Sequence, residues 1–146
     1  MSQKRWPLIG TLLVALLPLG ACGQDAADAA ADPPAQVEEA VGSELSRITL
    51  TADAARRLGI ETSVVEEGAG GDGLVVPYAA VLYDAEGITW AYVNPEELVF
   101  VREQLVVERI DGDVAMLSDG PAPGTAVVTV GAAELYGTET GVGGGH

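Results

Sequence analysis

Apolar segments of strand length, separated by turn-forming residues, occupy most of the chain between residues 46 and 137. Residues 88–93 and 125–130 are examples, rich in β-branched side chains, and residues 98–110 form a longer segment with Glu103 as a point where it could break. Short apolar segments bounded by glycine, proline, asparagine and aspartate are typical of strands. The pattern predicts a mostly β fold, a small β-barrel or β-roll of about six strands.

Turn-forming residues predict where these strands connect. Asp111 and Gly112 lie between two apolar runs, and this dipeptide favours the positive φ angles of a tight hairpin turn. It predicts paired strands at residues 106–110 and 113–117. Further turns are expected at residues 84–87 and 94–97, and loops at residues 68–73 and 118–124.

One short helix is expected before the β-rich region. Thr51 is suited to cap the N-terminus of a helix over residues 52–58, and Gly59 is suited to end it.

The first 21 residues have the pattern of a secretory signal peptide. Lys4 and Arg5 precede an apolar stretch at residues 8–19, which is shorter than the roughly 20 residues that a membrane-spanning helix needs. The stretch ends in Leu-Gly-Ala-Cys at residues 19–22, which resembles the lipobox of bacterial lipoproteins. Cys22, the single cysteine of the chain, is therefore predicted to carry a lipid anchor that holds the protein on the extracytoplasmic face of the cell membrane.

Composition divides the rest of the chain. Residues 22–45 are acidic and rich in alanine and proline, which predicts a disordered linker. Residues 46–137 form the expected β-rich domain, and the glycine-rich residues 138–146 are expected to be a disordered tail.

The charge balance excludes one class of partner. After cleavage, five arginines and all 22 acidic residues remain, a formal charge of −17. Such a surface repels phosphate backbones, so nucleic-acid binding is not expected.

No residue pattern predicts an enzyme, a cofactor or a metal site. The single histidine, His146, ends the glycine-rich tail, where nothing would position a catalytic base. Asp111, Asp113 and Asp119 suggest a calcium loop, but they lack the spacing of an EF-hand and are better explained as turn residues. Met116 is expected to lie in the core.

Aromatic residues on strands usually lie in the core or form cross-strand pairs. Three of them, Tyr78, Trp90 and Tyr92, are nevertheless candidates for an exposed partner surface.

Two segments carry a resemblance to a known family. The first resembles the membrane-proximal domain of periplasmic adaptor (membrane-fusion) subunits of RND-type efflux systems. The similarity lies in the succession of four stretches along the chain, residues 76–82, 90–93, 109–118 and 123–132. Residues 48–62 are similar to the segment that opens the mature part of such adaptors. The resemblance implies that both segments meet in one β-rich domain. Between them this chain has only about a dozen residues, where a full adaptor has a lipoyl-like domain, a β-barrel and a helical hairpin.

The resemblance and the anchor together predict a non-enzymatic, lipid-anchored accessory protein of a membrane transport system, such as an efflux system, that acts by docking to another protein. The partner is expected to be a membrane transporter or another envelope protein. A free-standing envelope lipoprotein that binds a small ligand or peptide, and a structural protein of the envelope, remain alternatives.

Overall fold

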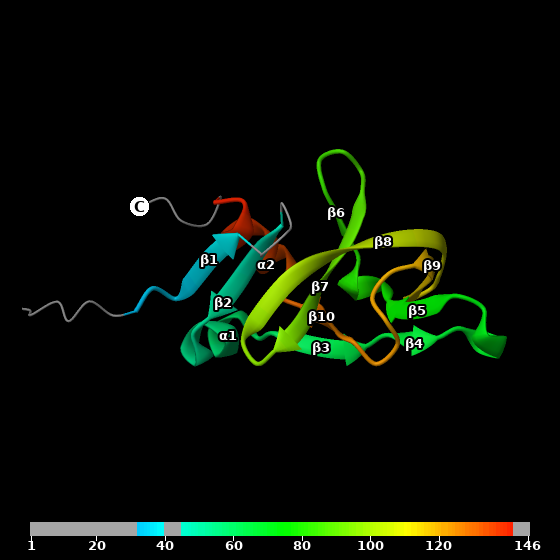
Figure 1. Ribbon diagram of the computed structural model, residues 1–146, viewed down its shortest axis with the longest axis horizontal. Coiled ribbons are helices and arrows are strands. Elements are labelled where there is room, and N and C mark those ends of the chain that lie inside the picture. Colours follow the sequence, from blue (N-terminus) through cyan, green and yellow to red (C-terminus); the bar gives the residue numbers. More distant parts are fainter. Residues whose placement is uncertain (1–31, 40–44, 142–146) are drawn as a thin grey trace, which may run out of the picture. The chain divides into compact units, whose positions relative to one another are not determined.

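A computed structural model describes residues 32–39 and 45–141; the predicted signal peptide, Cys22 and His146 lie outside these residues. The described part is mostly β (Figure 1), which confirms the predicted fold class. In chain order the elements are β1 (Ala35–Glu39), β2 (Ser46–Leu50), α1 (Ala52–Leu58), β3 (Glu61–Val64), β4 (Glu66–Glu67), η1 (Ala69–Gly71), β5 (Leu74–Pro77), η2 (Tyr78–Ala80), β6 (Leu82–Tyr83), β7 (Thr89–Glu96), β8 (Val99–Asp111), β9 (Val114–Asp119), β10 (Ala126–Val130) and α2 (Ala132–Glu139).

The strands form one curled sheet in the order β3-β10-β7-β8-β9-β5-β4, with β2 joined to β8, β1 to β2 and β6 to β7. The described residues thus contain ten strands, more than the six or so expected, because the two-residue strands β4 and β6 and the polar strand β1 leave no apolar pattern in the sequence. The path begins at β3 and ends at β4, which are separated in the chain by Val65 alone. The sheet therefore curls almost into a barrel.

Strand β8 is the element that holds the two halves of the sheet together. Its 13 residues run without a break at Glu103. The first half pairs with β2 and β7, and the second half pairs with β9. The register of β8 against β9 shifts between Val106 and Arg109, and such bulges let a long strand bend. Figure 1 shows β8 curving from β2 to β9.

Both faces of the central strands are buried. On β7, Ala91 and Val93 point into the curled sheet, whereas Tyr92 points to a second apolar cluster on the opposite face. The second cluster also contains Ala54 of α1 and Leu135 of α2, so the two helices cover this outer face. Alternation along each strand supplies both clusters, as expected of a sheet that is covered on both sides.

Helix α1 forms as predicted. The Thr51 hydroxyl accepts a hydrogen bond from the Ala54 amide at 3.2 Å, and Gly59 adopts the left-handed conformation that ends the helix. No helix within residues 32–39 and 45–141 is long and apolar enough to cross a membrane.

Two boundaries of the predicted domain were wrong. Residues 35–39 were expected to be disordered linker, but they form β1, antiparallel to β2 with Ala35 opposite Leu50. The composition of these residues is polar, but the free edge of β2 supplies backbone partners that composition does not reveal. At the other end, α2 reaches Glu139, inside the predicted tail, because Leu135 is fully buried against the sheet.

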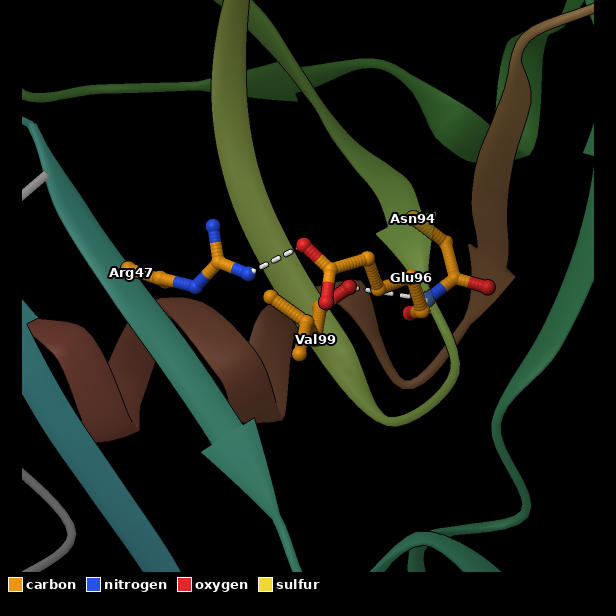
Figure 2. Close-up of polar contacts among 4 residues, drawn as sticks. All are labelled: Arg47, Asn94, Glu96 and Val99. Atoms are coloured by element: carbon orange, nitrogen blue, oxygen red, sulfur yellow. Dashed lines mark hydrogen bonds and ion pairs between the residues drawn. The ribbon is translucent and has the colours of Figure 1, made fainter.

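The turn expected at residues 94–97 lies further along the chain. β7 continues to Glu96, and the turn consists of Glu97 and Leu98, whose φ is +62°. The Asn94 side-chain amide donates to the carbonyl oxygens of Glu96 at 2.6 Å and Val99 at 2.8 Å, as Figure 2 shows. Arg47 of β2 forms an ion pair with Glu96 at 2.7 Å (Figure 2). These contacts stabilise the turn in which Leu98 adopts positive φ, although the sequence pattern predicted Leu98 to begin a strand.

The hairpin predicted at Asp111 and Gly112 is confirmed, one residue later than expected. Asp111 pairs with Val114, so Gly112 and Asp113 are the two loop residues. Gly112 has φ of +59°, whereas Asp113 has negative φ, so only the first of the two loop residues needs positive φ.

We expect Gly112→Val to lower the free energy of unfolding by roughly 1–3 kcal/mol, because a β-branched residue resists positive φ. Space is not the reason, since a Cβ at Gly112 would meet no atom within 4 Å. Gly112→Asn is the matched control and should lose much less, because asparagine tolerates the left-handed region. Urea unfolding of both variants makes the comparison, and equal losses would contradict the conformational explanation.

Candidate interaction surface

The hairpin of β6 and β7 carries a loop whose shape is fixed by Asp84. One oxygen of its carboxylate accepts hydrogen bonds from the amides of Glu86 at 3.0 Å and Ile88 at 2.8 Å. The other accepts a hydrogen bond from the Trp90 indole at 2.8 Å. The Trp90 contact is the largest of the causes that lower the pKa of Asp84, so the carboxylate stays ionised. The loop is thus held rigid although it projects from the sheet (Figure 1).

Apolar side chains are exposed on this hairpin and beside it: Tyr78 lies in η2, Tyr83 on β6 and Ile88 at the end of the loop. Tyr78, Tyr83 and Ile88 are 40%, 51% and 39% exposed. The neighbouring Tyr78 side chain raises the pKa of Tyr83, and burial adds to the rise. We call these three residues the hairpin surface. Exposed tyrosines on regular secondary structure suit protein binding, because they provide contact area with little loss of conformational entropy.

The three aromatic residues predicted as a partner surface do not share one face. Tyr78 belongs to the hairpin surface, and Trp90 is half-buried on the other side of β7. Tyr92 is fully buried, which corrects its assignment to an exposed surface. Tyr83 and Ile88 were missed, although the turn that follows Tyr83 in the sequence was a usable signal.

Tyr92 instead belongs to a polar network that fastens α2 to the sheet. Its hydroxyl donates to the Glu139 carboxylate at the end of α2. Glu139 also forms an ion pair with Arg102 Nε at 2.7 Å, and the two side chains are only 5% and 16% exposed. The Arg102 guanidinium carbon lies 4.9 Å from the ring centre of Trp90 and 5.4 Å from that of Tyr136. We call these five residues the α2 clamp.

The register of the sheet explains how the clamp forms. Tyr92 of β7 lies directly opposite Arg102 of β8, and Trp90 lies two residues before Tyr92, so all three side chains share one face. Tyr136 and Glu139 are three residues apart on α2 and meet this face together. Arg102 Nε is close to Glu139 but not aligned for a hydrogen bond, so the attraction there is chiefly ionic.

Burial and the neighbouring Glu139 carboxylate raise the pKa of Tyr92 well above its usual value of about 10. The folded state therefore favours the protonated phenol. This contribution to stability is complete below pH 10 and declines as the pH rises toward the folded pKa. When the pH rises from 9 to 11, the free energy of unfolding should fall in both proteins. We expect the fall to be roughly 1.4 kcal/mol smaller for Tyr92→Phe than for the wild type, because phenylalanine has no hydroxyl to titrate. Urea unfolding at both pH values tests this, and equal losses would contradict it.

The residues considered for a metal site do not converge. Asp111 and Asp113 lie at the tight turn at one end of β9, and Asp119 ends β9 at the other. Within the described residues, no group of three or more histidine, cysteine, aspartate or glutamate side chains could hold a metal ion. Met116, expected in the core, is half-buried on β9 and contacts Arg109.

A shallow pocket of about 150 Å³ lies where β3 and β5 approach each other. Its lining combines apolar side chains with two carboxylates: Ser63, Val64, Glu66, Val75, Val76, Pro77, Asp113 and Val114. The interior of the curled sheet is different, because buried aliphatic side chains such as Val76, Leu105 and Val127 fill it.

Comparison with known proteins gives no relative: no family model, no curated protein and no solved structure matches this chain. Its function has to be argued from its own residues.

Proposed function

We propose that this protein is a lipid-anchored docking module, an accessory or adaptor-like subunit of a membrane transport system, an efflux system being the one that the resemblance suggests. Cys22 would carry the anchor on the extracytoplasmic face of the membrane. The hairpin surface would bind the partner. The protein would hold that partner near the membrane and turn over no substrate.

The observation that carries the proposal is the joining of the two adaptor-like segments in one sheet. Residues 48–62 supply most of β2, all of α1 and the first half of β3, and residues 76–132 supply β7 to β10. β2 pairs with β8, with Ile48 opposite Phe100, and β3 pairs with β10, with Thr62 opposite Val128. The resemblance to adaptor subunits implies this meeting of the two segments. The exposed hairpin surface supports the docking role, because exposed large apolar side chains on a strongly charged protein favour a protein partner.

The alternative, a lipoprotein that binds a small ligand, has one observation in its favour, the pocket between β3 and β5. Its volume of about 150 Å³ is below the range of about 300–1,000 Å³ typical of small-molecule sites. Buried aliphatic side chains, among them Val76, Leu105 and Val127, pack together in the interior of the curled sheet. Docking is therefore the better supported of the two.

Co-purification from solubilised membranes tests the proposal. We expect the lipidated protein to enrich a membrane transport protein, identified by mass spectrometry. Tyr83→Ser should reduce that enrichment at least fivefold, since a tyrosine at the centre of an interface contributes about 1–2 kcal/mol or more. Val130→Ser is the matched control, because Val130 is 43% exposed on β10, outside the hairpin surface.

Two results would contradict the proposal. The first is that the wild-type protein enriches no membrane transport protein. The second is that Tyr83→Ser and Val130→Ser reduce the enrichment equally, which would remove the hairpin surface from the interaction.

A further inference from the structure

The curled sheet has an open seam between β3 and β5. β4 pairs with β5 through Glu66 opposite Val75 and Glu67 opposite Leu74, and the pairing stops there. β3 pairs with β10 on its other side, so its outer edge faces the gap. The pocket of about 150 Å³ lies in this seam, and we call its eight lining residues the seam pocket.

The seam pocket is apolar along its strands and acidic at two points. Val64 is 50% exposed there, with Val114 and Pro77 on the opposite strands. Glu66 and Asp113 contribute the two carboxylates. Among the described residues, neither carboxylate takes part in a hydrogen bond or an ion pair.

The basic residues of the domain are engaged elsewhere. Arg47, Arg56 and Arg102 each pair with a carboxylate outside the seam. Arg57 donates to the backbone of α1, and Arg109 contacts Met116. Within residues 32–39 and 45–141, no arginine lines the seam pocket or neutralises its carboxylates. The charge at the seam is therefore left for a partner to balance.

The size of the pocket selects the kind of ligand. A volume of about 150 Å³ is below the range of about 300–1,000 Å³ typical of small-molecule sites, and it suits one amino-acid side chain. Lysine and arginine combine an aliphatic stem with a charged head, and they bury the stem on apolar surface while the head stays at the rim. Val64 and Val114 match the stem, and the two carboxylates match the head.

We propose that the seam pocket binds an extended segment of a partner protein through a single basic side chain. The stem of that side chain lies against Val64 and Val114, and its head lies between Glu66 and Asp113. This proposal uses residues separate from the hairpin surface, so it holds or fails independently of the proposed function.

Peptide titration of the isotope-labelled, lipidated full chain in detergent micelles tests the proposal. The probes are the acetylated, amidated peptides Gly-Val-Arg-Val-Gly, its citrulline counterpart and its glutamate counterpart. We expect the arginine peptide to shift the amide signals of Ser63, Val64 and Val114 by nuclear magnetic resonance. The citrulline peptide should bind at least fivefold more weakly, and the glutamate peptide should give no shift. Binding of the arginine peptide should weaken with added salt.

Variants separate the seam pocket from general attraction to an acidic protein. Glu66→Gln with Asp113→Asn should weaken binding of the arginine peptide at least fivefold, whereas Glu134→Gln on the exposed side of α2 should leave it unchanged. Both seam carboxylates are exposed, so the double variant should fold normally. Equal binding of the arginine and glutamate peptides, an unchanged affinity in the double variant, or the same amide shifts with calcium chloride alone would each overturn the proposal.

Discussion

Glu139→Ala is expected to lower the free energy of unfolding by about 3 kcal/mol. The substitution leaves Arg102 charged and 84% buried beside two aromatic rings, and it removes the acceptor of the Tyr92 hydroxyl. Breaking a buried ion pair from one side typically costs about 3–5 kcal/mol, and the partial exposure of Arg102 places this case at the lower end. Urea unfolding followed by circular dichroism measures the loss.

A matched control and a double variant show whether the α2 clamp is the cause. Glu134→Ala, on the exposed side of the same helix, should change stability by no more than about 0.5 kcal/mol. The double variant Arg102→Ala with Glu139→Ala should lose less than the sum of the two single losses, because no unpaired charge remains. Additive losses, or a Glu139→Ala variant as stable as Glu134→Ala, would contradict the clamp.

Cys22→Ser is expected to abolish lipidation completely. Serine cannot form the thioether to diacylglycerol, and Cys22 is the single cysteine of the chain. Metabolic labelling with a palmitate analogue should therefore give no labelled protein, and the variant should leave the membrane fraction. Ala26→Ser, which introduces the same hydroxyl four residues later, is the control and should label normally. A Cys22→Ser variant that still takes up label would show that the lipobox interpretation is wrong.

The elements that could be predicted from the sequence are those fixed by local chemistry. Thr51 and Gly59 bound α1 because a hydroxyl and a left-handed glycine satisfy the ends of any short helix. Gly112 marked the β8–β9 hairpin for a similar local reason, although the turn starts one residue later than predicted. The displaced turn at Glu97 and Leu98 depends on hydrogen bonds from Asn94, whose partners lie up to five residues away and leave no mark in the apolar pattern.

The candidate surface was only partly predictable, because exposure is a property of the assembled sheet. Tyr78 and Tyr92 look equivalent in the sequence, each beside apolar neighbours. Tyr92 is buried because α2 returns to cover its face of β7, whereas Tyr78 in η2 remains 40% exposed. The same return of the chain brings Glu139 to Arg102, 37 residues away in sequence, and this pairing could not be predicted without the tertiary structure.

The sequence by itself determined the mostly β class, the place of the hairpin and the bounds of α1, since alternation, glycine and capping residues act over a few neighbours. Only the tertiary structure decided that residues 35–39 join the sheet, that α2 is clamped by Glu139, and that β3 and β5 leave an open seam. Each of these depends on which distant backbone or charge lies opposite, and pairings at long sequence separation are set by the packing of the whole sheet rather than by local preference.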